Sequence, residues 1–222
     1  YGGTWWAPYI DLERGRDVTV NDEKLVAASL VKLYIMLAVF DGIEHGTITD
    51  DANVNALLKH MITVSSNEAA NGLLSRIGNG DGKAAIATVT ATAQRYGFTS
   101  SEELRTLTGM ASGNAVENWT STRDCGSFLS QVYAGTLVSK NASERMMQLL
   151  LGQTRRTKIP AGVPSGVKVA NKTGELAAVQ NDVAIVFGTH PYVLAVMSSD
   201  ISSAVAPSQI TELSRAVWDA AQ

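Results

Sequence analysis

The feature that most constrains the fold is an apolar run, residues 25–40, that contains a single charged residue, Lys32. The run is too long for a strand and predicts a buried helix from about residue 29 to residue 40, closed by Asp41 and Gly42. A helix that is apolar on all sides must be enclosed by other elements. The lysine inside it has two explanations: its amine reaches solvent from a buried stem, or it serves as a base for Ser29, which precedes it by three residues.

Three blocks of different periodicity make up the chain. Residues 5–20 are typical of two short strands around a turn, and alternation from residue 166 onward predicts three more strands and an amphipathic helix over about 207–221. The block between them has helical periodicity over 49–78, with a break at 63–67, over 82–96 and over 122–151. Because both ends of the chain are rich in strands, we expect them to share one antiparallel sheet. Residues 97–119 are polar and irregular, a long loop of a kind that is often functional.

Composition excludes several classes of protein. The chain has 222 residues and a net charge of −3, without a long basic run, which argues against nucleic acid or an anionic membrane as partner. Neither of its long apolar runs reaches the ~20 residues of a membrane span. Cys125 is the one cysteine, and the three histidines show no ligand spacing, so we expect no disulfide, no metal and no cofactor. We expect Cys125 to be a packing residue.

Three short motifs occur in a fixed order. They are Ser-Leu-Val-Lys at 29–32, Ser-Ser-Asn at 65–67, at the predicted break between two helices, and Lys-Thr-Gly at 172–174, near the end of a predicted strand. Each motif alone is common in chains of this length. All three together, each in a suitable structural context, indicate a catalytic site.

The chemistry of these residue types favours nucleophilic catalysis. Ser29 and Lys32 lie on one face of the predicted helix, and a serine hydroxyl needs a neighbour that takes its proton. A lysine can do so if burial and a nearby positive charge, which Lys172 could supply, lower its pKa. The backbone N–H of Ser29 at the start of a helix would stabilise developing negative charge. Ser65 could relay a proton, and the Asn67 amide could hold a substrate amide.

With these motifs the sequence resembles the superfamily of serine β-lactamases and penicillin-binding proteins, and most closely class A β-lactamases. The similarity extends to residues 57–78 around the second motif and 159–174 before the third, and covers nearly the whole chain. It implies a two-lobed α/β (α+β) fold, with a five-stranded antiparallel sheet flanked by helices and an all-helical lobe. The chain 1–222 would be a single catalytic domain, with an α/β lobe of about 1–28 plus 160–222 and a helical lobe of about 29–159.

The resemblance also implies roles for individual residues. Ser29 would be the acylated nucleophile and Lys32 its base, and the backbone N–H groups of Ser29 and Glu175 would form the oxyanion hole. Lys172 and Thr173 would meet a substrate carboxylate. Assigned by type, the catalytic residues are Ser29, Lys32, Ser65 and Lys172, and the substrate-binding residues are Asn67, Thr173, Gly174 and Glu175.

The sequence departs from the class A pattern at the base for deacylation. The Glu-x-x-Leu-Asn element that carries this glutamate in class A enzymes is absent. Glu102, Glu103 and Glu117 lie in the corresponding region, and we expect them to be surface carboxylates. The acyl-enzyme is therefore expected to form and to deacylate slowly.

A second departure is Glu175, which directly follows the Lys-Thr-Gly motif. A carboxylate there would repel the carboxylate of a β-lactam. Gln180 offers no compensating charge. We expect Arg155 and Arg156 to be a solvated pair in a loop.

Three functions remain open at this stage. The first is a serine hydrolase or acyl-transferase acting on a β-lactam or a related amide or ester; the second is a D,D-peptidase-like penicillin-binding protein acting on cell-wall peptides; the third is a weakly catalytic binding or sensor module. All three imply a small-molecule or peptide partner and, by resemblance, a secreted or cell-envelope protein of a bacterium. We expect a monomer, and no leader is visible after Tyr1.

Overall fold

The predicted buried helix is present and begins with a tighter turn. In the computed structural model, which describes residues 2–107 and 116–222, the 3-10 turn η1 (Ala28–Val31) leads directly into helix α1 (Lys32–Glu44). Every residue from 30 to 40 is buried. The helix runs past its predicted end and includes Gly42, where a Cβ would lie 2.7 Å from Ile48 Cδ1, so the glycine lets the following turn pack closely against the helix.

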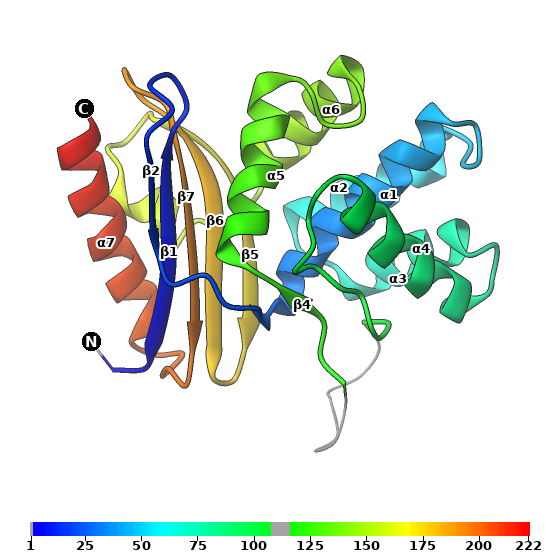
Figure 1. Cartoon of the computed structure of the whole chain (residues 1–222), viewed down its shortest axis with the longest axis horizontal. Coiled ribbons are helices and arrows are strands. Elements are labelled where there is room, and N and C mark those ends of the chain that lie inside the picture. Colours follow the sequence, from blue (N-terminus) through cyan, green and yellow to red (C-terminus); the bar gives the residue numbers. More distant parts are fainter. Residues whose placement is uncertain (1, 108–115) are drawn as a thin grey trace.

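The two ends of the chain meet in one antiparallel sheet, as predicted. The described residues form a five-stranded sheet of order β2-β1-β7-β6-β5. Its strands are β1 (Thr4–Asp11), β2 (Asp17–Val20), β5 (Lys168–Leu176), β6 (Val179–Phe187) and β7 (Tyr192–Ser199). Strand β1 pairs with β7, with Trp6 opposite Met197, so the first strand lies beside the last (Figure 1). The predicted fold class is confirmed.

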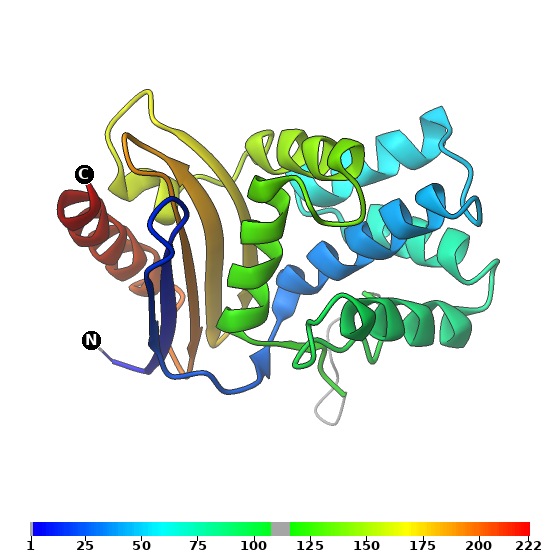
Figure 2. The same ribbon diagram turned by 45° about the horizontal axis from the view of Figure 1, so that its top comes forward.

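Both faces of this sheet are covered, which explains why residues 183–187 of β6 and 192–197 of β7 are apolar without interruption. Helix α7 (Ala206–Ala221) covers one face, and helix α5 (Thr122–Ala134) packs on the other, against β1, β6 and β7 (Figures 1 and 2). Side chains of β6 alternate between the two layers. Val183 and Ile185 join the core on the α1 side, while Ala184 and Val186 pack in the core under α7.

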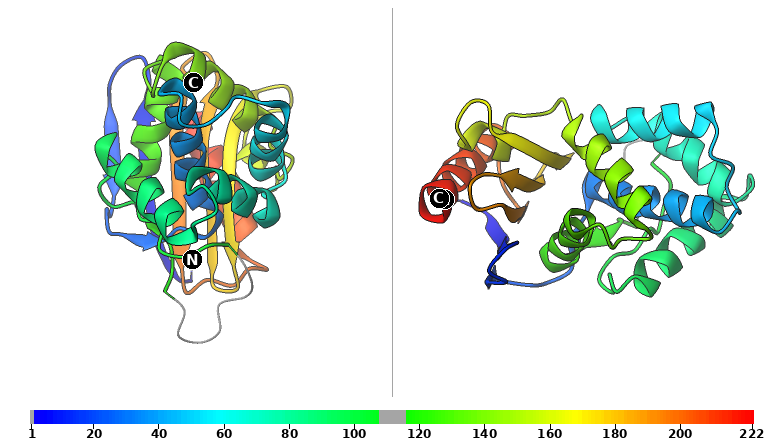
Figure 3. Two further views of the ribbon diagram at one scale, coloured as in Figure 1. Left: turned by 90° about the vertical axis from the view of Figure 1, so that its right-hand side faces the viewer. Right: turned by 90° about the horizontal axis from the view of Figure 1, so that it is seen from above.

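The remaining helices surround α1 on the side away from α7 (Figure 3). They are α2 (Ala52–Thr63), α3 (Asn67–Ile77), α4 (Gly82–Arg95) and α6 (Lys140–Leu151). The segment 122–151 is two helices, because Gly135 takes a left-handed conformation (φ 73°) after α5 and Ser139 caps α6. The lobe boundaries remain a prediction; α5 falls within the proposed helical lobe, yet it lies on the sheet.

Of the long loop predicted at 97–119, the structure describes residues 97–107 and 116–119, and residues 108–115 lie outside the described residues. It is anchored by a bridge between Glu102 and Trp119 in the short strand β4 (Trp119–Thr120), which pairs with β3 (Leu25–Val26). The chain segment before η1 is therefore tied to this loop. Within the described residues, no helix combines the length and apolarity needed to cross a membrane.

Candidate active site

Three separate elements bring the three motifs together. Ser29 lies in η1, and Lys32 is the first residue of the adjoining helix α1. Ser65 lies two residues before α3, whose first residue is Asn67. Lys172 lies in β5. Short local elements hold each motif, and only the packing of α1, α3 and β5 places them side by side. The site is therefore a tertiary arrangement of locally encoded parts.

Lys32 is at the centre of the hydrogen-bond network. Its Nζ lies 2.6 Å from the Ser65 carbonyl oxygen, 2.7 Å from Asn67 Oδ1, 3.1 Å from Ser29 Oγ and 3.2 Å from Ser65 Oγ. A neutral amine has two N–H groups, which match the two shortest contacts. Its lone pair is then free to accept the proton of the Ser29 hydroxyl.

Lys172 reaches the same network from the sheet. Its fully buried amine donates to the Thr173 carbonyl at 2.7 Å and to Ser65 Oγ at 2.9 Å. The Ser65 hydroxyl thus lies within hydrogen-bonding distance of both lysine amines. This position suits a group that passes a proton between them and a substrate.

The turn that carries Ser65 is unusual in its backbone. Ser65 has a φ of 61°, and Ala28, which precedes Ser29, has a φ of 47°. Non-glycine residues in this left-handed region carry strain of roughly 1–3 kcal/mol, and such residues gather at functional sites. Ser66 then caps α3 by accepting a hydrogen bond from Ala69 N at 3.1 Å, which orients the first turn and Asn67.

The glycine of the third motif permits close packing. A Cβ at Gly174 would lie 2.8 Å from the Ala27 carbonyl oxygen and 3.2 Å from Leu30 N, so β5 passes directly against η1. Thr173, the preceding residue, is 3% exposed. The glycine therefore sets the distance between the strand and the turn that carries Ser29.

Burial is the main cause of the lowered pKa values of both lysines. It lowers the pKa of Lys32 to about 8, with Arg155 as the nearby positive charge and Glu103 opposing. It also lowers the pKa of Lys172 well below its ordinary value, with Lys32 and then Arg155 contributing. We expected Lys172 to be the positive charge that acts on Lys32. Arg155 is a further positive charge close to both amines, and the repulsion between the two lysines disfavours the charged form of each.

Glu103 is not a surface carboxylate, and that expectation was wrong. Its side chain is 1% exposed, because its backbone exchanges two 3.0 Å hydrogen bonds with the Thr90 hydroxyl on α4. Among the described residues no side chain or backbone group donates to its carboxyl oxygens. Burial raises its pKa to about 8, with Arg105 and Lys32 opposing. A buried carboxyl therefore lies within electrostatic range of Lys32.

The other two glutamates of this region are engaged in ion pairs. Glu102 pairs with Lys24 at 2.7 Å, and Glu117 pairs with Arg105 at 2.9 Å. Both are partly exposed, so neither has the inward position of Glu103.

Glu175 is neutralised from inside the protein. Its Oε2 accepts from Arg155 at 2.6 Å and its Oε1 accepts from Lys158 at 3.0 Å. We expected Arg155 to be a solvated loop residue, but it pairs with Glu175. Its neighbour Arg156 donates a hydrogen bond to the Val169 carbonyl oxygen at 3.3 Å. Gln180 lies opposite Glu175 in β6 and supplies no charge.

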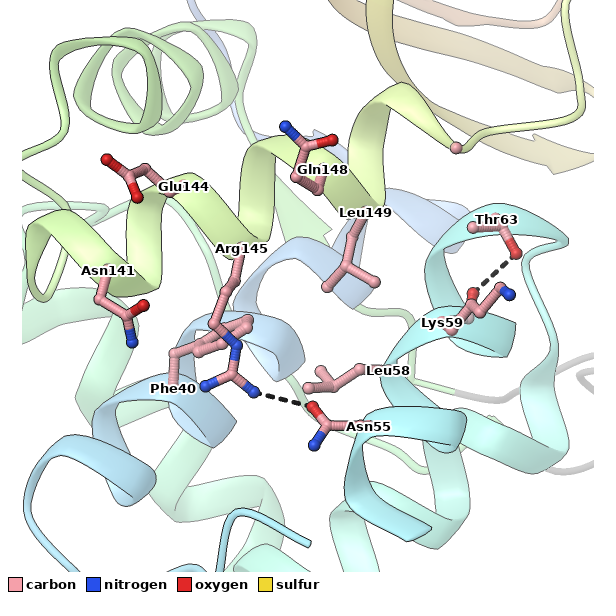
Figure 4. A pocket seen from close by; sticks show the side chains of 11 residues that line it. Phe40, Asn55, Leu58, Lys59, Thr63, Asn141, Glu144, Arg145, Gln148 and Leu149 are labelled. Carbon is pink, nitrogen blue, oxygen red and sulfur yellow. Dashed lines mark hydrogen bonds between the residues drawn. The ribbon is translucent and has the colours of Figure 1, made fainter. Parts of the chain in front are cut away.

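A cavity of about 430 Å³ opens beside Ser29. Its lining includes Ser29, Asn67, Arg105, Glu117, Asn118 and Glu175. A larger cavity of about 640 Å³ lies elsewhere, between α1, α2 and α6 (Figure 4). Arg145 crosses it, stacked 4.9 Å from the centre of the Phe40 ring and bonded to Asn55 at 2.7 Å. Its lining lacks the motif residues, so the cavity beside Ser29 is the candidate site.

Neither a metal centre nor the thiol supplies an alternative reactive group within the described residues. In the described part of the chain no three His, Cys, Asp or Glu side chains come together as metal ligands. Cys125 is buried beside Tyr34, and burial raises the pKa of its thiol to about 12. A thiol held protonated in this way is inert as a nucleophile.

Sequence reasoning missed three residues of the site region: Glu103, Arg155 and Lys158. Glu103 stands in an irregular segment, where periodicity gives no measure of burial. Arg155 and Lys158 precede Glu175 by 20 and 17 residues, and only the return of the chain past Glu175 brings them to the site. Among these, the position of Glu103 in the loop after the helical block was the one available signal.

Comparison with protein families gives a match over almost the whole chain. The model described as "Beta-lactamase enzyme family" matches residues 1–55 and 49–221. No curated protein matches the sequence significantly.

Solved structures of similar fold are numerous. A β-lactamase from Sphaerobacter thermophilus is 23% identical, with 99% of this chain and 92% of that chain covered and a TM-score of 0.87. A mutant of PBP-A, solved as an acyl-enzyme complex with penicillin G, is 23% identical, with coverage of 98% and 89% and a TM-score of 0.85. A β-lactamase from Xanthomonas campestris is 19% identical, with coverage of 98% and 92% and a TM-score of 0.83. At these identities the likeness shows the fold alone.

Proposed function

The chain belongs to the beta-lactamase enzyme family, and from this premise we propose that it forms a covalent acyl ester on Ser29 with a β-lactam or a related amide or ester. The observation that carries the proposal is the 3.1 Å contact between Lys32 Nζ and Ser29 Oγ, made by an amine whose pKa is lowered to about 8. A PBP-A mutant of the same fold has been solved as such an adduct with penicillin G.

Acylation proceeds through the groups around Lys32. The Ser29 hydroxyl gives its proton to the neutral Lys32 amine while Oγ bonds to the carbonyl carbon. The backbone N–H groups of Ser29 and Glu175 stabilise the oxyanion. When the carbonyl carbon–nitrogen bond breaks, the leaving nitrogen takes a proton from the Ser65 hydroxyl, which is refilled from Lys32 at 3.2 Å.

Deacylation requires a second base, and we propose Glu103. A water molecule attacks the ester carbonyl carbon and its proton passes to the Glu103 carboxylate. As the bond between that carbon and Ser29 Oγ breaks, the Glu103 carboxylic acid returns the proton to Oγ by way of the Lys32 amine. Because burial raises the pKa of Glu103 to about 8, most of this carboxyl is protonated at pH 7 and unable to act as a base. Slow deacylation at neutral pH follows, and its rate rises as the pH passes through about 8.

The test follows intact mass over time with a fluorescent penicillin. Wild-type protein should gain one adduct mass and Ser29→Ala none. After removal of free penicillin, the adduct should decay slowly at pH 7 and faster at pH 9, and it should persist at both pH values in Glu103→Gln. Glu102→Gln, a change to a partly exposed glutamate that pairs with Lys24 and does not line the cavity beside Ser29, should decay like wild type.

Each contrary outcome has a definite meaning. Decay that is fast at pH 7 or unchanged in Glu103→Gln excludes this glutamate as the deacylating base. A stable adduct at every pH favours a penicillin-binding protein that acts on cell-wall peptides. The absence of any adduct with β-lactams or D-alanyl esters favours a binding module. Since β-lactams and cell-wall peptides occur in the bacterial envelope, we propose that the protein is exported there.

A further inference from the structure

Glu175 carries the charge that is hardest to reconcile with a β-lactam site. Its side chain is one-third exposed and lines the cavity that contains Ser29. Each of its carboxylate oxygens is taken by a different cation, Oε2 by Arg155 at 2.6 Å and Oε1 by Lys158 at 3.0 Å. Lys158 is 1% exposed and also donates to the Asn181 carbonyl at 3.2 Å, so it is fixed in place.

Arg155 is the positive charge at the edge of the reaction centre. Its guanidinium is near enough to lower the pKa of both Lys32 and Lys172. Burial raises the pKa of Glu175, but the hydrogen bond and charge of Lys158 and the charge of Arg155 outweigh it, so its pKa is lowered. The carboxylate is therefore ionised at neutral pH and remains the counter-ion of Arg155.

The second cation near the cavity is also engaged. Lys172 is fully buried and donates to the Thr173 carbonyl and to Ser65 Oγ. An incoming carboxylate would have to displace Glu175 from Arg155 or break the network of Lys172. Either exchange removes charge-assisted hydrogen bonds that the free protein already makes.

We infer that Glu175 is a specificity-determining residue: its carboxylate occupies the cationic subsite formed by Arg155 and Lys158, so the site disfavours acyl donors that carry a carboxylate there and prefers uncharged esters or amides. This inference rests on the proposed acylation of Ser29. It assigns to the protein a substrate class that differs from that of carboxylate-bearing β-lactams.

A matched pair of probes tests it: benzylpenicillin and benzylpenicillin methyl ester, which differ by one charge at one position. The readout is the ratio of the two acylation rate constants, acid over ester, measured by intact mass. A general effect on the nucleophile cancels in this ratio. In Glu175→Gln the amide can still accept from Lys158, while its NH₂ group cannot accept from Arg155. The ratio should rise about tenfold to a hundredfold, the range of a hydrogen bond to a charged group.

Arg155→Ala completes a double-mutant cycle. Alone, it should not raise the ratio, because Glu175 already engages the guanidinium in the wild type and its charge is afterwards balanced by Lys158 alone. Combined with Glu175→Gln, it should abolish the gain. If Glu175→Gln fails to fold because the buried Lys158 charge is left without a counter-ion, Glu175→Gln with Lys158→Met removes that charge and should also show a rise, since Arg155 is still free.

Three results would separate the possible failures. An unchanged ratio in the folded Glu175 variants overturns the inference. A gain that survives when Arg155→Ala is combined with Glu175→Gln also overturns it, because the guanidinium would then not be the group that Glu175 withholds from the substrate. No adduct with either probe in any variant, wild type included, instead refutes the acylation of Ser29.

Discussion

At the scale of the residue, the site depends on a buried amine that is only partly charged. Removal from water destabilises an ammonium ion more than a neutral amine, so burial, with the positive charge of Arg155 assisting and Glu103 opposing, moves the pKa of Lys32 to about 8. The four oxygen atoms within 3.2 Å then orient it toward Ser29. A lysine in water could not serve as a base at neutral pH.

Replacement of Lys32 by methionine keeps much of the side-chain volume and removes the base. We expect the acylation rate constant to fall by about 10²- to 10⁴-fold, the usual contribution of a general base. The rate of labelling by a fluorescent penicillin measures it, and Lys59→Met, at an exposed lysine of α2, provides the control.

The pH profile of wild-type acylation checks the same point. Below the pKa of Lys32 the amine is charged and cannot accept a proton, so the rate constant should rise with pH and level off above about 8. A flat profile from pH 6 to pH 9, or labelling of Lys32→Met at the wild-type rate, would show that another group activates Ser29.

At the scale of the element, the site depends on how closely β5 approaches η1. The strand can pass the turn because Gly174 has no side chain on the face that meets Ala27. The N-cap of α3 fixes the opposite wall, where Ser66 holds the first turn that presents Asn67. Both features act on the backbone, and each can be changed without altering a catalytic side chain.

Gly174→Ala should force the strand away from Ser29. Its Cβ would lie 2.8 Å from a backbone oxygen, and overpacking of this kind typically costs about 1–3 kcal/mol of unfolding free energy. Denaturant unfolding measures the stability, and the labelling rate should fall with it. Gly82→Ala in α4 meets no atom within 4 Å and should lose neither stability nor labelling.

Ser66→Ala removes the N-cap of α3 and should cost about 0.5–2 kcal/mol. Ser139→Ala removes the equivalent cap of α6, where the Ser139 hydroxyl accepts from Ala142 N at 3.3 Å, and should cost a similar amount. Only the first change should also slow acylation, because only α3 carries a residue of the site. Equal labelling rates in the two variants would exclude the cap as a positioning element.

At the scale of the whole molecule, a buried carboxylate joins separate parts of the sheet region. Asp182 in β6 accepts from Asn171 in β5 at 2.9 Å and from the backbone N–H of Ile159 at 2.9 Å, at the start of the 3-10 turn η2 (Ile159–Gly162). Burial raises its pKa to about 6, against the hydrogen bonds and the positive charge of Lys158. The folded protein therefore holds this proton more tightly than the unfolded chain does.

The consequence for stability has a definite sign. The contribution of Asp182 is fully present below its unfolded pKa of about 4 and is lost as the pH rises through about 6. The unfolding free energy of wild type minus that of Asp182→Asn should therefore fall by up to ~3 kcal/mol between pH 4 and pH 7, at about 1.4 kcal/mol for each pKa unit. Rotation of the Asn171 amide, whose Oδ1 has no partner among the described residues, can satisfy the new NH₂ group.

Denaturant unfolding at a series of pH values measures this difference for both proteins. A constant difference would show that Asp182 has the same pKa in the folded and unfolded states. A difference that grows with pH would show that the folded protein binds the ionised carboxylate more tightly.

The sequence by itself determined the parts that depend on local spacing. Ser29 and Lys32 share a helical face because they are three residues apart, and the alternation after residue 166 indicated the strands of the sheet. The order of strand and helix blocks indicated that the chain ends meet, as β1 and β7 do. These features follow from backbone geometry that repeats over a few residues.

Only the tertiary structure decided the electrostatics of the site. The burial of Glu103 depends on an irregular segment held by Thr90, and the neutralisation of Glu175 depends on Arg155 and Lys158 returning past the strand. A pKa is set by burial and by charges that are close in space, whatever their separation in the chain. The motifs could therefore be recognised from the sequence, whereas the burial and protonation of Glu103 and the neutralisation of Glu175 could not.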